Sequence, residues 1–79
     1  MCGIIAYKGN KKASTLLLHG LQILEYRGYD SVGMATLANG AITVKKEVGK
    51  VGEVDKKIDF ATLEGTTGIA TLAGARMAA

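Results

Sequence analysis

The apolar positions of the chain follow two different spacings, which predict strands and helices in alternation. The run Cys2–Lys8 is almost continuously apolar and ends at Gly9, so it predicts a strand with little room for a solvent-facing side. In Lys11–Tyr26 the leucines recur at helical spacing, which predicts an amphipathic or largely buried helix, and Gly28 is a natural stop for it. These leucines are Leu17, Leu21 and Leu24.

The centre of the chain predicts a β-hairpin. Ser31–Ala38 alternates between small and apolar residues, and Ala41–Val48 resumes the alternation with Ile42 and Val44 on one face. The Asn39-Gly40 pair between the two runs is the strongest two-residue hairpin signal that a sequence offers.

The last third predicts a short helix and the start of a further strand. Gly49–Asp59 is charged and carries apolar residues at helical spacing, so a short second helix followed by a loop is expected. Gly65–Ala70 predicts the beginning of another strand. From Thr71 onward the residues are small and show no clear periodicity, so we divide the chain into residues 1–70 and a divergent tail, 71–79.

Composition narrows the class of protein. The 79 residues are 48% apolar with a net charge of +3, which is typical of one small globular domain or a piece of a larger one, without the basic stripe that nucleic acid requires. The longest apolar stretch, Leu16–Leu24, is too short for a membrane span. A lone cysteine and the lack of a secretory signal favour the cytoplasm. His19 has no ligand partner nearby, so we expect no metal and no cofactor.

The lone cysteine stands at position 2, where removal of Met1 would make it the amino terminus. An amino-terminal Cys carries its own base, because a free α-amine (pKa about 7.7 to 8.0) lies within one residue of a thiol (about 8.5). Cys2 is therefore the candidate catalytic nucleophile. The alternative is a thiol that merely follows the start codon.

Three sequence blocks resemble one enzyme family. Cys-Gly-Ile at residues 2–4, Leu-Glu-Tyr-Arg-Gly-Tyr-Asp-Ser at 24–31 and Gly-Lys-Val at 49–51 resemble the amino terminus of the isomerising glutamine:fructose-6-phosphate aminotransferases, or glucosamine-6-phosphate synthases. The likeness extends over residues 1–70. It implies an α+β fold: part of the αββα sandwich of the N-terminal nucleophile hydrolases, in which two sheets face each other between helical layers. The part expected here is a strand, a helix, a β-hairpin, a short helix and the start of a strand.

The resemblance also implies a glutaminase half-reaction with glutamine as substrate. Cys2 would attack the side-chain amide of glutamine, and the ammonia would pass to a separate sugar isomerase domain, which is absent here, in a parent that is a homo-oligomer. Arg27 and Asp30 match positions that resemble active-site support in the family. The alternative for both is a purely structural role in holding the turn together.

The tail departs from the family pattern. After Gly-Ile-Ala at 68–70 the family continues His-Thr-Arg-Trp-Ala-Thr-His-Gly, a block that helps to hold glutamine, whereas this chain has Thr-Leu-Ala-Gly-Ala-Arg-Met-Ala. Read one frame over, codons for residues 70–78 accommodate that block apart from its Ala. We therefore expect one base to be missing near codon 70 and residues 71–79 to be out of frame.

Three functions remain open at this point. The first is a fragment of the aminotransferase, inactive by itself and poorly soluble, because strand edges would be exposed. The second is a fragment of another class II glutamine amidotransferase, since a Cys-Gly-Ile start is common to that class. The third is a small non-catalytic interaction domain, which would retain Met1 and fold cooperatively.

Overall fold

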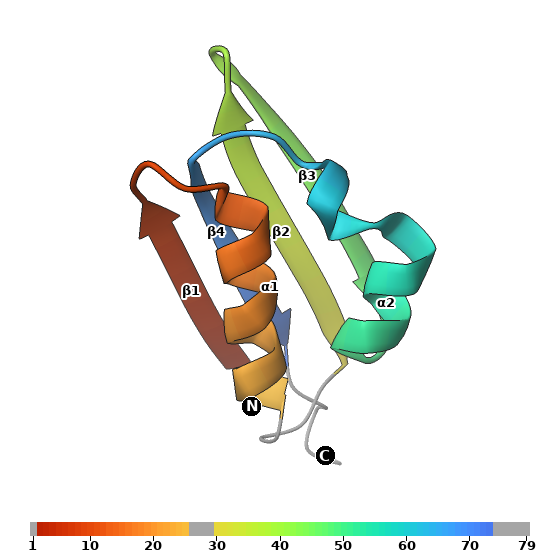
Figure 1. The fold of residues 1–79 in the computed structure, drawn as a ribbon. Helices are drawn as coiled ribbons and strands as arrows, with labels where there is room; N and C mark the ends of the chain where they lie inside the picture. Colours follow the sequence, from red (N-terminus) through yellow and green to blue (C-terminus); the bar gives the residue numbers. More distant parts are fainter. Residues whose placement is uncertain (1, 26–29, 74–79) are drawn as a thin grey trace.

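The computed structural model describes residues 2–25 and 30–73, which form one antiparallel sheet with helices against one of its faces (Figure 1). The strands are β1 (Cys2–Lys8), β2 (Ser31–Ala38), β3 (Ala41–Val48) and β4 (Thr67–Ala73). The helices are α1 (Ala13–Leu24), α2 (Val51–Ile58) and a 3-10 turn, η2 (Phe60–Thr62). The expected order of elements and the α+β class are confirmed.

The strand order β1-β4-β2-β3 places the last strand along the chain in the interior of the sheet. Because β1 and β2 are both antiparallel to β4, they run parallel to each other, and α1 is the crossover that connects them. Within the described residues, β1 has its sheet pairing with β4 alone. The amino-terminal strand is therefore connected to the rest of the sheet through residues 67–73.

The hairpin has the predicted strands and the predicted turn. Ser31 pairs with Val48 at one end of the ladder and Ala38 pairs with Ala41 at the other. Asn39 (φ 52°) and Gly40 (φ 78°) both take positive φ angles, as a two-residue type I′ turn requires.

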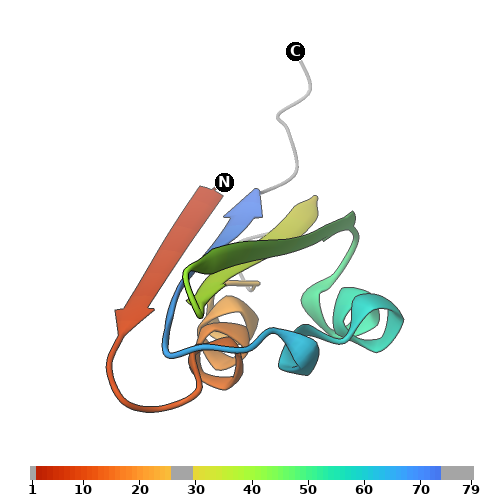
Figure 2. The ribbon, with the colours of Figure 1, turned by 90° about the horizontal axis from the view of Figure 1, so that it is seen from above.

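The hydrophobic core lies between the sheet and the helices (Figure 2). The helical spacing read from the sequence is confirmed for α1, since Leu17 and Leu21 are fully buried, while Leu24 packs at the margin of the core. Phe60 of η2, in the segment where the sequence predicted a loop, is buried as well. The other large core side chains come from the sheet, from α2 and from the residue after η2: Val32, Met34, Leu72, Val51, Val54 and Leu63.

Polar contacts from other elements hold the carboxyl end of α2. Asp59 ends the helix with a left-handed conformation (φ 51°). Lys45 of β3 donates a hydrogen bond from Nζ to the carbonyl oxygen of Ile58 at 2.5 Å, and Asp55 Oδ1 accepts one from the amide of Phe60 at 3.0 Å. A lysine ammonium is favourable at this position, because the last carbonyl groups of a helix carry partial negative charge.

The second face of the sheet has no covering layer within the described residues. The expectation that β1 lacks a solvent-facing side is wrong, because its burial alternates and Ile4 is 70% exposed. The helices cover one face, and the alternate residues of every strand point away from them. The exposed large apolar residues on this open face are Ile4, Leu37, Ile42, Val44, Val48 and Ile69. The described residues thus supply one sheet and one helical layer of the expected sandwich.

The open face is expected to make the isolated chain self-associate, because an exposed apolar patch of this kind favours contact between copies. Replacing both Ile42 and Val44 by Thr keeps β-branched side chains on an exposed strand. The change should lower the self-association measured by sedimentation velocity and alter the unfolding free energy by only about 0.5 kcal/mol.

Val54→Thr is the matched control, since it places the same hydroxyl in the core, where it should lower the unfolding free energy by about 1 to 3 kcal/mol. An Ile42→Thr, Val44→Thr variant that sediments like the parent chain at every concentration would contradict the prediction.

Strand β4 extends past Ala70, the last residue of the segment in which the sequence predicted the beginning of a strand. Ala70 and Leu72 are buried on the helical face and Thr71 between them is exposed, so the alternation continues to Ala73. Leu72 pairs with Gly3 on one side and with Val32 on the other. The first three residues of the divergent tail therefore fit the sheet, while residues 74–79 lie outside the described part of the chain.

Candidate active site

One end of the sheet collects the candidate nucleophile and the starts or ends of all four strands. Cys2 begins β1 and pairs with Ala73, Ala73 pairs with Ser31, and Ser31 pairs with Val48. The residues form a row across the sheet. This row puts Cys2 at the end of the sheet, as expected, and the structure adds that its strand is an edge strand. The side chain of Cys2 is not among the parts that the structure describes.

Of the two support residues predicted from the sequence, the structure describes one. Asp30 is exposed, directly precedes β2, and accepts a hydrogen bond at its main-chain carbonyl from the amide of Gly49 at 3.0 Å. Arg27 lies outside the described residues. The contact found for Asp30 thus ties the start of β2 to the end of β3 through the backbone.

Glu25 is a residue that the sequence analysis did not single out. It follows α1, and its Oε2 accepts a hydrogen bond from the amide of Val51, the first residue of α2, at 2.6 Å. One feature of the sequence could have pointed to this residue: Glu25 and Val51 belong to two of the three blocks that resemble the aminotransferase family. Proximity in space between those blocks could not be read from their spacing of 26 residues.

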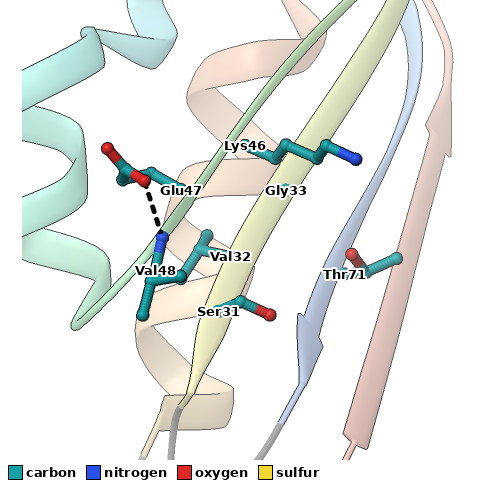
Figure 3. Close-up of a pocket in the computed structure, with 7 residues that line it drawn as sticks. All are labelled: Ser31, Val32, Gly33, Lys46, Glu47, Val48 and Thr71. Carbon is teal, nitrogen blue, oxygen red and sulfur yellow. Dashed lines mark hydrogen bonds between the residues drawn. The ribbon is translucent and has the colours of Figure 1, made fainter.

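A pocket of about 310 Å³ opens beside the row (Figure 3). Thr71 of β4, which pairs with Ile4, borders it one strand away from β1. Gly33 leaves space there, since a Cβ at this position would lie 3.4 Å from Lys46 Cβ and 3.4 Å from Thr71 Oγ1. The residues lining the pocket are Ser31, Val32, Gly33, Lys46, Glu47, Val48 and Thr71.

Two neighbouring residues of β3 border the pocket and carry charge, Lys46 and Glu47, and their side chains leave opposite faces of the sheet. The amide of Val48 donates a hydrogen bond to Glu47 Oε1 at 3.1 Å (Figure 3). On the other side of the carboxylate, Lys57 Nζ lies 3.5 Å from Oε2. The Val48 hydrogen bond, with a smaller contribution from the Lys57 charge, lowers the pKa of the Glu47 carboxyl from its ordinary value. Glu47 is therefore a carboxylate at neutral pH, but it faces α2, so the open side of the pocket offers the Ser31 and Thr71 hydroxyl groups and the Lys46 ammonium.

Within residues 2–25 and 30–73, no three His, Cys, Asp or Glu side chains are grouped so that they could hold a metal ion. The helices in that part of the chain are too short or too polar to cross a membrane.

The chain is similar in sequence to curated enzymes over most of its length. No protein-family model matches it. It is 55% identical over 69 residues to the glutamine–fructose-6-phosphate aminotransferase (isomerizing) of Methanocaldococcus jannaschii, with 87% of this chain and 6% of the relative covered. The enzymes of the same name from Pyrococcus horikoshii and Methanococcus maripaludis are 54% and 58% identical over the same length, with 12% and 11% of each relative covered.

The fold also has a counterpart among solved structures. The structure of the allosteric regulatory enzyme of purine biosynthesis matches 95% of this chain with a TM-score of 0.84, at 21% sequence identity and over 16% of that protein. The arrangement of strands and helices is therefore a known one. The chain spans only 6% to 12% of the length of the three aminotransferases named above. By sequence, it is a homologue of a short segment of the isomerising glutamine–fructose-6-phosphate aminotransferases.

Proposed function

We propose that this chain is the nucleophile-bearing part of a glutaminase domain, from an enzyme that takes ammonia from glutamine for the synthesis of glucosamine-6-phosphate. The observation that carries the proposal is the 55% identity over 69 residues to an aminotransferase of that specificity. The block at residues 24–31 supports the fructose-6-phosphate enzyme over other class II amidotransferases, and the complete protein would add a sugar isomerase domain.

The chemistry requires only one side chain from this segment. Once Met1 is removed, the α-amine of Cys2 takes the thiol proton, and the sulfur attacks the side-chain amide carbon of glutamine. The proton passes to the departing nitrogen, so ammonia leaves and a thioester remains. Water then hydrolyses the thioester to glutamate and regenerates the thiol. Dividing amide cleavage in this way replaces one difficult step by two easier ones.

The sheet supports this role by giving Cys2 a defined place. Residue 2 is held by backbone pairing with Ala73, and β1 packs its alternate residues on α1 through Ile5. We propose Arg27 and Asp30 as active-site support, because they shortly precede Ser31 in the sequence and Ser31 stands in the row beside Cys2. The complete protein is proposed to be cytoplasmic and to form a homo-oligomer.

One missing base near codon 70, in the gene or in its reading, would account for the divergent tail. We propose that residues 71–79 are out of frame and that the fit of Leu72 to the core follows from its apolar side chain at an alternating position. Sequencing the encoding DNA from codon 65 onward tests this directly. An alternative frame that encodes His-Thr-Arg-Trp and continues as an amidotransferase supports the proposal, and a DNA sequence with no such frame contradicts it.

The isolated 79-residue chain is expected to release no measurable glutamate from glutamine. Its sequence lacks the block that clamps glutamine in the family, so substrate positioning is lost. The 79 residues also lack the later Asn-Gly that helps to form the oxyanion hole in the family. Loss of a single oxyanion donor by itself lowers a rate by about 10² to 10³. Glutamate release should be followed with a coupled dehydrogenase assay on purified chain and on Cys2→Ala. Release that disappears in Cys2→Ala would refute the expectation of inactivity.

Intact-mass analysis of the same protein separates the glutaminase from the non-catalytic interaction domain. A chain that begins with Cys2 has the free α-amine that the mechanism uses as its base. A chain that retains Met1 has that amine blocked, and would favour the interaction domain.

A further inference from the structure

Three hydrogen-bond donors border the open side of the pocket beside Gly33 (Figure 3). Gly33 pairs with Lys46 of β3 on one side and with Thr71 of β4 on the other, so the three residues form a row across the sheet. The Lys46 side chain extends over Gly33 toward β4, and Ser31 lies on the same face of β2. Within residues 2–25 and 30–73, neither hydroxyl nor the ammonium has a hydrogen-bond or ion-pair partner.

Gly33 leaves the floor of the pocket open between two of these donors. A Cβ at this position would lie 3.4 Å from Lys46 Cβ and 3.4 Å from Thr71 Oγ1, so it would stand between the two side chains. Since glycine has no Cβ, an atom of a ligand can take that place and remain within reach of both donors.

The charge of the open face favours an anion. Among the described strand residues, the charged side chains on this face are both lysines, Lys46 and Lys8. Lys45 and Glu47 of β3 instead contact α2 on the helical side. Lys46 therefore has no carboxylate beside it on the open face of the described strands, and its positive charge attracts anions from solution.

We propose that this pocket binds a small molecule through an oxyanion, a phosphate group or a carboxylate, with the Lys46 ammonium and the Ser31 and Thr71 hydroxyls as donors. All three groups donate hydrogen bonds to oxygen, and the ammonium adds charge. The volume of about 310 Å³ is at the lower end of the range for small-molecule sites, which leaves space for the body of the ligand. The site is independent of the proposed function, because Thr71 belongs to the tail and the pocket is that of the 79-residue chain as it stands.

Amide chemical shifts of the ¹⁵N-labelled 79-residue chain test the site with inorganic phosphate and with acetate, each added at constant ionic strength. The protein concentration should be one at which the chain sediments as a monomer. Saturable shifts centred on Gly33, Lys46 and Thr71 are expected for at least one anion, with a dissociation constant on the order of 1 mM. The anion that binds more tightly identifies the ligand as a phosphate or a carboxylate. Shifts that rise without saturation for both anions, or that spread over all the lysines, would overturn the proposal.

Two lysine variants separate the site from the net charge of the chain. Lys46→Gln should weaken binding about tenfold, the loss expected for one charge-assisted hydrogen bond. Lys8→Gln is the matched control, because it removes the same charge from the same face, beside another threonine, Thr67. It should leave the dissociation constant unchanged. Equal weakening by the two variants would mean attraction by net charge alone and would contradict the proposed site.

Gly33→Ala tests the shape of the pocket without changing its charge. The added Cβ would meet Lys46 and Thr71 at ordinary van der Waals distance, so the sheet accommodates it, and the spectrum of the variant reports whether it is folded. Affinity for the anion should fall by a factor comparable to that in Lys46→Gln. A folded Gly33→Ala chain that binds as tightly as the parent would place the anion elsewhere and overturn the proposal. None of these readouts involves glutamine, so the result is separate from that of the glutaminase proposal.

Discussion

A chimaera in which the 69 matched residues replace their counterpart in the Methanocaldococcus jannaschii aminotransferase is expected to hydrolyse glutamine, and Cys2→Ala is expected to abolish that activity. The 55% identity makes the segment compatible with the rest of the domain, which would supply the glutamine clamp missing from this chain. Without the sulfur no thioester can form, so the rate should fall by a factor on the order of 10⁶, as for nucleophile removal in other covalent hydrolases.

The controls for the chimaera come from this chain. His19 is exposed on α1 and has no assigned role, so His19→Ala should leave the rate unchanged. Cys2→Ser keeps an oxygen nucleophile of higher pKa and should retain a small residual rate. Glutamate production by a folded Cys2→Ala chimaera at the parent rate would exclude Cys2 as the nucleophile. A folded chimaera with no activity in any form would contradict the proposed function itself.

Gly65→Ala is expected to destabilise the chain by about 3 kcal/mol or more, a large part of the stability of a domain of this size. Gly65 has φ +108°, a conformation that side chains other than glycine rarely adopt. A Cβ there would overlap the carbonyl oxygen of Leu37 and lie 3.0 Å from its carbonyl carbon, and the backbone of β2 cannot move aside without disturbing its pairing. The carbonyl of Gly65 also accepts the amide of Ala13 at 2.9 Å, so the strain would reach the start of α1.

Gly52→Ala is the matched control for this substitution. Gly52 lies in α2 with open space around its Cβ position, so alanine should stabilise the helix by about 0.5 to 1 kcal/mol. Urea denaturation followed by circular dichroism measures both changes. A Gly65→Ala chain that unfolds within 1 kcal/mol of the parent, as judged by the scale of ordinary surface substitutions, would show that this close approach is not a constraint.

Local patterns in the sequence were sufficient to predict the four strands, the two helices and the hairpin turn. Asn39-Gly40 determines the turn because few other residue pairs accept two positive φ angles in succession, and the observed ladder runs from Ser31 to Val48 as predicted. The spacing of Leu17 and Leu21 likewise identified the buried side of α1. The same reasoning placed the nucleophile candidate at the first position of a strand.

Patterns in the sequence were less informative where burial depends on distant parts of the chain. The apolar run of β1 suggested a strand covered on both sides, but helices cover only one face, and Ile4 is exposed on the other. The strand after Gly65 was expected to begin without a known place in the sheet. Its position between β1 and β2 depends on contacts between residues 30 or more positions apart, which no local period encodes.

By itself, the sequence determined the type and order of the elements, the hairpin register and the identity of the candidate nucleophile, because each depends on the preferences of adjacent residues. Only the tertiary structure decided which sheet face is open, that β4 lies beside Cys2, and that Glu25 caps α2 across 26 residues of chain. These features arise from long-range pairing, in which an amide or a side chain takes whichever partner the complete fold brings within reach.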